Sequence, residues 1–261
     1  MKKILIDKIP VILPPEIEKL CCGARIFDSS CSPEAKVYFI DKGEGYYLKC
    51  AAGGSLLRER IMTEYFRKIG LGARVLGYYS GEGDLLLTTR VRGEDCTHEK
   101  YKSEPKRLCD LLAERLRILH DADFSNCPVK DRVSEYIARA EKNYADDNYN
   151  KEHFPDSFGY SSGEEAHRAL EGGKHLLKND VLLHGDYCMP NVMLDNWRFS
   201  GFIDVDSAGV GDRHIDLFWG MWSLQFNLGT NEFASRFLDA YGRDKVDAEV
   251  LKIVAAAEVL G

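Results

Sequence analysis

The chain has 261 residues, of which 44% are hydrophobic and 30% are charged, and this balance excludes disordered and collagen-like polypeptides. Asp and Glu outnumber Lys and Arg by 42 to 35, so the formal net charge is −7. Because nucleic acids and anionic membranes are polyanions, binding to either is disfavoured, whereas a cationic small molecule is attracted. The length approaches the upper limit for one core and favours two lobes.

The first residues lack the pattern of a signal peptide. Asp7, Lys8 and Pro10 interrupt the apolar stretch that begins at Ile4, and no later apolar run is long enough to span a bilayer. Eight cysteines are scattered without a Cys-x-x-Cys pair, which argues against a zinc site and for free thiols in a reducing compartment. We therefore expect a cytoplasmic protein that binds neither membrane nor nucleic acid.

The first third of the chain predicts a small antiparallel sheet with one inserted helix. Gly43 and Gly45 supply the positive φ angles that a hairpin turn between the first two strands requires. The helical pattern ends at Gly70. The expected strands are 35–40, 46–50, 75–79 and 85–89, and the expected helix is 55–69.

Beyond residue 92 the pattern becomes mainly helical. Leucines recur at helical spacing up to His120, and a second helix is expected over 133–144. Residues 146–162 are polar and aromatic and contain Pro155, which indicates a surface loop. Short strands are expected at 181–183 and 199–203, and the chain after Asp216 is expected to be mostly helical.

The segment between the last two strands carries the residues suited to catalysis. His184, Gly185 and Asp186 are followed by Asn191, five residues after the aspartate, and by Asp204 after the next strand. Two carboxylates and an amide in this order can converge on one cleft, and such a set suits phosphoryl transfer. In this interpretation Asp186 accepts the hydrogen bond of the attacking hydroxyl, and Asn191 and Asp204 bind Mg²⁺ at the nucleotide phosphates.

Each of these residues alone also has a structural explanation. Asp186 can cap a turn, Asn191 can satisfy a loop, and His184 can be a buried histidine bonded to the backbone. Their joint spacing is harder to explain by local structure and favours the functional interpretation. For His184 itself we expect a role as a scaffold of the loop.

These residues resemble a known family, the small-molecule branch of the protein-kinase-like fold, and within it the aminoglycoside phosphotransferases, especially the 3′ type. That branch has His-Gly-Asp with an asparagine five residues after the aspartate. The resemblance implies an α+β, protein-kinase-like two-lobed fold, with a small antiparallel-sheet N-terminal lobe at 1–92 and a mainly helical C-terminal lobe at 93–261. It implies ATP or GTP as the donor, Mg²⁺ as the metal, and an aminoglycoside hydroxyl as the acceptor.

The resemblance also assigns nucleotide-binding residues in the first lobe. Lys49 looks like the strand lysine that binds the α and β phosphates, and Glu59 like the helix glutamate that holds this lysine. Ser32 lies in a run similar to the nucleotide-positioning loop, which is one residue longer here. The backbone near Thr89 and Val91 occupies the place of the hinge that binds the purine edge. Taken alone, Lys49 and Glu59 would be surface charges.

The resemblance further suggests how the acceptor is bound. Asp146, Asp147 and Asp156 lie in a loop that corresponds to the acidic, substrate-covering insertion of the family, and Glu258 matches an acidic residue near its C-terminus. A solvated acidic loop is the alternative for these aspartates. Asp216 resembles the structural aspartate that supports the catalytic loop.

The chain departs from the 3′ enzymes on the acceptor side. Phe226 and Asn227 stand where those enzymes place acidic residues, and Trp219 and Trp222 make the same wall more aromatic. Ser207 stands where the family has an arginine. These departures leave the phosphotransferase chemistry intact and indicate a narrower or altered range of acceptors.

Three other functions remain as alternatives. The first is a kinase for choline, a sugar or another antibiotic, in which Trp219, Trp222 and Tyr241 would form an aromatic box for a quaternary ammonium group. The second is a metal-dependent phosphoesterase, and the third is a nucleotide-binding module without activity. A monomer and a homodimer are both compatible with the sequence.

Overall fold

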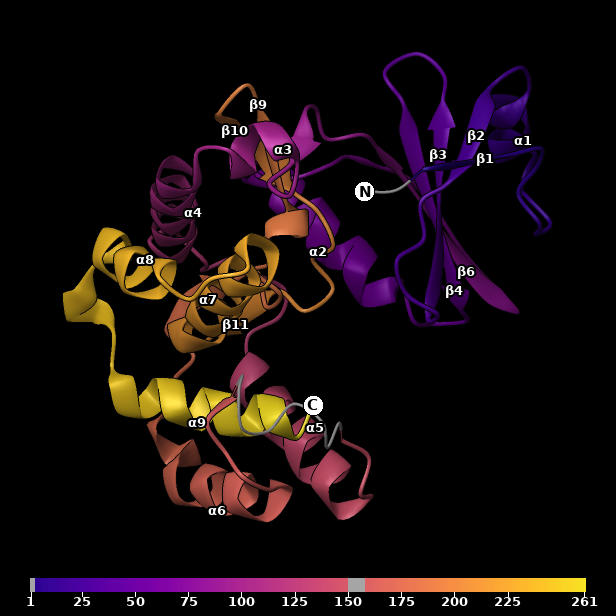
Figure 1. The fold of residues 1–261 in the computed structure, drawn as a ribbon. Helices are drawn as coiled ribbons and strands as arrows, with labels where there is room; N and C mark the ends of the chain where they lie inside the picture. The colour runs from indigo at the N-terminus through magenta and orange to yellow at the C-terminus, as the bar shows by residue number, and fades with distance from the viewer. Residues whose placement is uncertain (1–2, 150–157) are drawn as a thin grey trace. The chain divides into compact units, whose positions relative to one another are not determined.

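The computed structural model describes residues 3–149 and 158–261 (Figure 1). The chain divides into two compact units. Unit 1 contains the chain up to Asp95 together with Val192–Asp206, and unit 2 contains Cys96–Asn191 together with Ser207–Gly261. The expected lobe boundary after residue 92 stays a prediction, but the segment 192–206 groups with the first unit. Among the described residues, no helix is both long enough and apolar enough to cross a membrane.

Unit 1 is built on a six-stranded sheet in which every neighbouring pair of strands is antiparallel, in the order β1-β2-β3-β4-β6-β5. Two helices, α1 and α2, belong to the same unit. The bounds are β1 Ile4–Ile6, α1 Pro15–Cys21, β2 Arg25–Asp28, β3 Ala35–Asp41, β4 Tyr46–Ala52, α2 Leu57–Lys68, β5 Val75–Ser80 and β6 Gly83–Thr89. The sheet, the inserted helix and all four expected strands are thus confirmed, whereas β1, α1 and β2 carried no clear sequence pattern.

The hairpin between β3 and β4 forms as expected. Ile40 pairs with Tyr46 at its closed end, and Gly43 and Gly45 have φ angles of 60° and 88°. At Gly45 a side chain would also lack space, because a Cβ atom there would lie 2.7 Å from the Phe39 ring. The hairpin aligns β4 so that its lysine, Lys49, stands opposite Val37.

A second, three-stranded sheet in unit 1 has the order β10-β9-β7. Its strands are β7 Glu94–Asp95, β9 Val192–Asp195 and β10 Arg198–Phe202. Phe202 at the end of β10 lies with its ring 6.1 Å from that of Phe66 on α2, and it forms a bridge with Gly72 just after this helix. This packing brings the chain that follows β10 to the first sheet.

Unit 2 is mainly helical, as expected. Leu170, Val254 and Ala166 are fully buried in its core, together with Tyr136. The only sheet among its described residues pairs β8 with β11. The bounds are α3 Glu99–Lys102, α4 Pro105–His120, α5 Arg132–Ala145, α6 Gly163–Gly173, η2 Lys174–Leu176, β8 Val181–Leu183, η3 Met189–Asn191, β11 Gly209–Gly211, α7 Arg213–Leu228, α8 Phe233–Tyr241, η4 Arg243–Lys245 and α9 Ala248–Val259.

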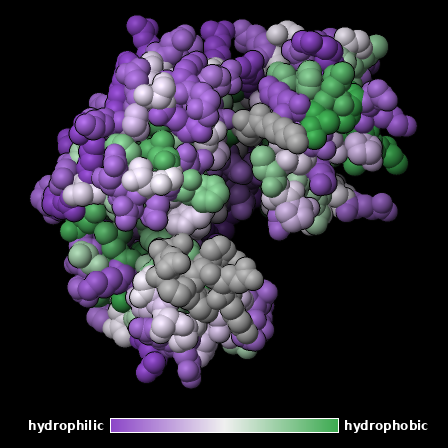
Figure 2. Space-filling view, viewed as in Figure 1, coloured by the Kyte–Doolittle hydropathy of each residue, from purple (hydrophilic) through white to green (hydrophobic). Residues whose placement is uncertain are grey.

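The surface is polar over most of the face drawn in Figure 2, where hydrophobic residues gather over the β1 to β3 region of unit 1. Ile4, Leu5 and Ile12 are exposed large apolar residues of this unit. Ile4 and Leu5 lie on the short edge strand β1, and Ile12 lies in the chain that follows this strand.

Candidate active site

Three charged side chains meet within unit 1. The ammonium group of Lys49, on β4, lies 2.7 Å from Glu59 Oε2 and 2.7 Å from Asp204 Oδ1. Glu59 is in the first turn of α2, and Asp204 follows β10. The resemblance implies a contact between Glu59 and Lys49, and the structure has this ion pair together with a second carboxylate, Asp204, on the same lysine.

Burial and charge together shift the pKa values of this cluster. Burial alone would lower the pKa of Lys49, but the carboxylates of Asp204 and Glu59 outweigh it and raise this pKa above its usual value. Burial raises the pKa of Glu59 to about 7, and the negative charge of Asp204 acts in the same direction against the attraction of Lys49. Lys49 is therefore a protonated cation that two carboxylates hold in place.

The backbone at Asp204 adopts an uncommon conformation. Its φ angle is +59°, in the left-handed region that costs about 1–2 kcal/mol for a residue other than glycine. Its side chain is half exposed even though one oxygen contacts Lys49. A hard carboxylate held in this way on an accessible turn is suited to bind a divalent cation.

The loop His184–Asn191 of unit 2 holds the second group of candidate residues. Asn191 donates from its side-chain amide to Asp186, at 2.8 Å to the carboxylate Oδ2 and at 3.0 Å to the main-chain oxygen. The carbonyl oxygen of Asn191 is consequently the end of the amide directed away from Asp186. Asp186 is half-buried, so its carboxylate is fixed without being sealed from a ligand.

Asp216, near the start of α7, holds the other end of this loop. It is fully buried and accepts from the main-chain N–H groups of His184 and Gly185, each at 2.7 Å. His120 lies 3.2 Å from the same carboxylate. His184 is also fully buried, and its Nδ1 accepts from the Asp186 N–H at 3.3 Å. Asp216 and His184 thus act as scaffolds of the loop, as the sequence predicted.

The remaining nucleotide candidates belong to unit 1. Ser32 is exposed in the connection between β2 and β3, where its hydroxyl donates to Glu34. The N–H of Thr89, at the end of β6, donates to the Arg74 oxygen at 2.9 Å. Val91 is buried. Since the N–H of Thr89 is engaged, a purine bond at this residue has to use its carbonyl oxygen.

The predicted acceptor residues lie in different environments. Asp146 follows α5 with an exposed side chain and pairs with Lys142 at 2.5 Å. Asp147 is exposed and has a φ angle of 51°. Asp156 lies outside the described residues, so its place stays a prediction.

Glu258, on α9, is an internal carboxylate rather than an exposed acid. Its side chain is 4% exposed, and it accepts from Tyr136 Oη at 2.8 Å and from Trp219 Nε1 at 3.0 Å. Burial raises its pKa, Arg139 and these two donors oppose the shift, and the charge of Asp186 adds to it.

The proposed aromatic box is wrong in one member. Tyr241 is fully buried, with its hydroxyl 2.8 Å from His120 Nδ1 and the two ring centroids 5.6 Å apart. Trp219 and Trp222 instead contact each other, with ring centroids 5.4 Å apart. Tyr241 is therefore part of the core that supports Asp216 through His120.

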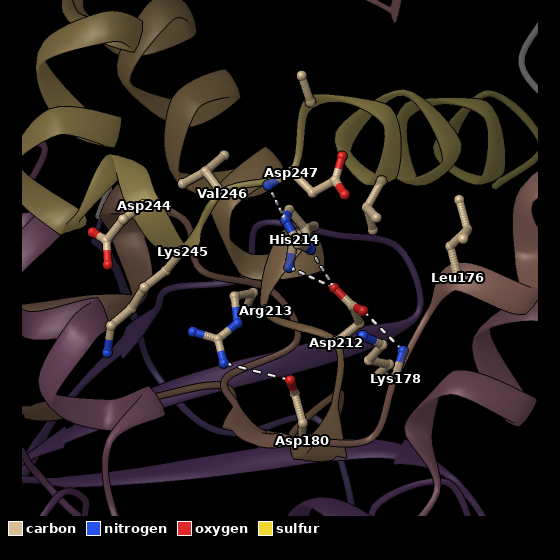
Figure 3. Close-up of a pocket in the computed structure, with 12 residues that line it drawn as sticks. Leu176, Lys178, Asp180, Asp212, Arg213, His214, Asp244, Lys245, Val246 and Asp247 are labelled. Carbon is tan, nitrogen blue, oxygen red and sulfur yellow. Dashed lines mark hydrogen bonds and ion pairs between the residues drawn. The ribbon is translucent and has the colours of Figure 1, made fainter.

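A polar pocket of about 470 Å³ lies elsewhere in unit 2, between the first residues of α7 and α9. Figure 3 shows His214 between Asp212 and Asp247: its Nδ1 lies 2.6 Å from Asp212 Oδ1, and its Nε2 accepts from the Asp247 N–H at 2.9 Å. Arg213 turns toward Asp180 at 3.5 Å. These contacts join two helix starts, so we interpret the pocket as a structural junction that sets α7 and α9.

One further residue that positions the loop was missed in the sequence. Ser223, on α7, is buried, and its hydroxyl accepts from the main-chain N–H of Met189 at 2.8 Å. The signal that could have found Ser223 is its spacing from Asp216, seven residues or about two helical turns, which puts both residues on one face.

Comparisons with known proteins give one consistent result. A family model described as the phosphotransferase enzyme family, APH, matches residues 26–252. A probable aminoglycoside 3′-phosphotransferase of Lactococcus lactis subsp. lactis is 50% identical over 260 residues, which cover 99% of this chain and 97% of the relative.

Solved structures share the fold. An aminoglycoside-3′-phosphotransferase of type VIII has a TM-score of 0.74 at 25% identity, covering 92% of this chain and 94% of its own. The aminoglycoside phosphotransferase APH(3″)-Id from Streptomyces rimosus, in complex with ADP and streptomycin, has a TM-score of 0.70 at 23% identity, covering 86% of this chain and 90% of its own. The similarity therefore extends over nearly the whole chain.

Proposed function

Because this chain belongs to the phosphotransferase enzyme family, with its protein-kinase-like α+β fold, we propose that it transfers the γ-phosphate of ATP or GTP to the 3′-hydroxyl of an aminoglycoside. The observation that carries this proposal is the fixed carboxylate of Asp186, held through its side chain by Asn191 on a loop that Asp216 anchors. The Lactococcus lactis relative, which is 50% identical to this chain over 97% of its own length, supports an aminoglycoside as the acceptor.

Asp186 is the proposed catalytic residue. The acceptor hydroxyl donates to its carboxylate, which orients an oxygen lone pair toward the γ-phosphorus. As the new O–P bond forms, the bond from the γ-phosphorus to the β,γ-bridging oxygen breaks, and the nucleoside diphosphate leaves. The hydroxyl proton passes to Asp186 and then to solvent. The amide of Asn191 keeps the carboxylate in place through this transfer.

Lys49 is the proposed ligand of the α and β phosphates. Its ammonium group lies 2.7 Å from the carboxylates of Glu59 and Asp204. These two contacts fix the position of the ammonium group before a phosphate binds. The carbonyl oxygen of Thr89 and the backbone of Val91 are the proposed contacts of the purine, and Ser32 that of a phosphate. The solved complex of the Streptomyces rimosus enzyme contains ADP, which supports a nucleotide donor.

The metal ligands that we propose for Mg²⁺ are Asn191 and Asp204. Both offer hard oxygen atoms, which Mg²⁺ prefers. Asn191 commits its NH₂ group to Asp186 and so keeps its carbonyl oxygen for a cation, and the Asp204 side chain is half exposed. These donors fit the metal, which when bound neutralises charge on the phosphates.

The acceptor is a polycation, and acidic residues are the proposed contacts of its amino groups. Asp146, Asp147 and Asp156 are the proposed contacts, whereas Glu258 is only 4% exposed and already accepts from Tyr136 and Trp219. The net charge of −7 favours the approach of such a molecule. Asp146 exchanges its present partner, Lys142, for a substrate ammonium group at little cost because both are exposed.

A phosphorylation screen tests the proposal directly. Purified protein is incubated with ATP or GTP, Mg²⁺ and each of kanamycin, choline and glucose, and NMR of the product identifies the modified hydroxyl. We expect phosphorylation of kanamycin at the 3′-hydroxyl. Product from choline with none from any aminoglycoside would reject the drug as acceptor and favour the metabolite kinase.

A further inference from the structure

The carboxylate of Asp84, a residue of the strand β6, lies at the start of the helix α2. Its Oδ2 accepts at 2.9 Å from the main-chain N–H of Leu56, the residue just before the helix. The first N–H groups of a helix have no partner within the helix, and a leucine side chain offers no oxygen to bind them. A carboxylate from another element therefore caps α2, at the end where the helix dipole favours a negative charge.

Asp84 is itself fixed in one position. Its side chain is fully buried, and it also accepts from Tyr78 Oη at 2.8 Å and from Ser80 Oγ at 2.7 Å, both on β5. Burial alone would raise the pKa of Asp84, but four donated hydrogen bonds outweigh it and hold this pKa at about 2. The cap of α2 is consequently a permanently ionised group anchored in the β5–β6 hairpin.

The cap determines what Glu59 is able to bind. Glu59 is the third residue of α2, and a glutamate at this position can reach back to the N–H of the residue before its helix. Here that N–H, of Leu56, donates to Asp84 instead. The Glu59 carboxylate lies 2.7 Å from the ammonium group of Lys49. The two carboxylates thus divide two tasks, the capping of α2 and the binding of the lysine.

The strand β6 also fixes the lysine side of this pair. Leu86, two residues after Asp84, stands opposite Lys49 in the β4–β6 pairing. The direct connection from β4 to α2 contains Gly53 and Gly54, and Gly54 has a φ angle of +82°. Because glycines restrict the backbone little, this connection alone does not define where α2 begins. The distance between Glu59 and Lys49 is set mainly through β6.

We propose that Asp84 is a positioning residue for nucleotide binding, because it occupies the Leu56 N–H and so leaves Glu59 available to hold Lys49. Without the Asp84 carboxylate, Glu59 turns back to the N–H at the start of its own helix. Lys49 is then left with Asp204 and loses its fixed position. This inference rests on the proposed function only through the role of Lys49 as a phosphate ligand.

Titration calorimetry with ADP and with GDP, in the presence of Mg²⁺, tests the inference without an acceptor. We expect Asp84→Ser to weaken nucleotide binding about three- to tenfold, the range of one lost helix cap. Asp84→Asn fills the same space with half as many acceptor oxygens and gives the same test if the serine variant does not fold, with an expected weakening of about two- to threefold. Ile17→Val, at a fully buried position of α1, lowers the stability of the same unit and should keep the wild-type affinity.

A double-mutant cycle shows whether Asp84 acts through the lysine. In a Lys49→Met background, we expect Asp84→Ser to weaken nucleotide binding by less than about twofold. A purely structural defect would lower the number of binding sites and leave the dissociation constant unchanged. An unchanged dissociation constant in Asp84→Ser, or equal weakening with and without Lys49, would overturn the inference and leave the proposed function standing.

Two results for the wild-type protein separate this inference from the proposed function. Nucleotide binding without phosphorylation of any aminoglycoside would reject the acceptor, while the cycle still decides the role of Asp84. Binding of neither ADP nor GDP would overturn both.

Discussion

The side-chain amide of Asn191 donates two hydrogen bonds to Asp186, at 2.8 Å to its carboxylate and at 3.0 Å to its main-chain oxygen. One residue therefore fixes both the rotamer of the catalytic candidate and the turn that carries it. The same amide presents its carbonyl oxygen on the opposite side, where the proposed metal contact lies. In the proposed mechanism, Asn191 therefore both positions the base and binds the cation.

Substitution of Asp186 tests its role as the base. In Asp186→Asn the amide cannot accept the hydroxyl proton, so we expect kcat to fall by about 10²–10⁴-fold, with the nucleotide affinity within about threefold of wild type. Steady-state kinetics and titration calorimetry with ATP measure the two quantities. Asp195→Asn, at an exposed position at the end of β9, is the control and retains full activity. Wild-type turnover in Asp186→Asn would remove Asp186 from the mechanism.

Loss of the lysine affects both nucleotide binding and stability. Lys49→Met removes the cation from between Glu59 and Asp204, so we expect the KM for ATP to rise at least about tenfold. We also expect the free energy of unfolding to fall by about 1–3 kcal/mol, since a buried carboxylate loses its partner. Lys36→Met, an exposed lysine of the adjacent strand β3, serves as the control. An unchanged KM in Lys49→Met would show that this lysine does not bind the phosphates.

The loop also depends on the absence of a side chain at Gly185. Its φ angle is +83°, and a Cβ atom would lie 2.0 Å from the main-chain oxygen of Ser207. We expect Gly185→Ala to lower the free energy of unfolding by about 2–4 kcal/mol, from the left-handed backbone and the forced movement of the neighbouring chain.

A second glycine provides the comparison for this substitution. A Cβ atom added at Gly172, in α6, would have no neighbouring atom within 4 Å outside the backbone of its own helix. Gly172→Ala is therefore expected to leave stability unchanged or to raise it by up to about 1 kcal/mol. Urea unfolding followed by circular dichroism measures both variants. Equal stabilities of the two would contradict the close approach of Ser207 to Gly185.

The sequence predicted best the elements whose signals are local. The hairpin at Gly43 and Gly45, the helix that carries Glu59 and the leucine-rich α4 all show a clear period or turn residue, and the structure confirms them. The strand β1 and the helix α1 were missed because they are short and lack such a period. Elements of this kind depend on packing against the sheet rather than on local preference.

The spacing of residues in the sequence could not predict what surrounds some of the site residues. The resemblance assigned Glu258 to the acceptor side, but Tyr136 and Trp219, distant in the sequence, donate to it in the core. The bond from Asp204 to Lys49 joins residues 155 positions apart. Contacts at such separation follow from the assembled fold, which no local pattern encodes.

The carboxyl group of Glu59 gives unit 1 a defined response to pH. Burial has a larger effect than the charges of the neighbouring residues and raises its pKa from 4.5 to about 7 in the folded chain. Between these two values the folded state binds more protons than the unfolded state, so the free energy of unfolding falls as the pH rises through this window. The loss of stability caused by the ionised Glu59 carboxylate is complete above about pH 7. It is absent below about pH 4.5, where the Glu59 carboxyl group is protonated in both the folded and the unfolded state.

Glu59→Gln should remove this response, because glutamine stays neutral at every pH. We expect the decline of the free energy of unfolding between pH 5 and 8 to be less steep in Glu59→Gln than in the wild-type protein, as measured by urea unfolding at several pH values. Glu64→Gln, on the exposed side of the same helix, controls for the change in net charge and should keep the wild-type slope. Parallel curves for Glu59→Gln and the wild type would mean that Glu59 is ionised throughout this range, with Lys49 outweighing its burial.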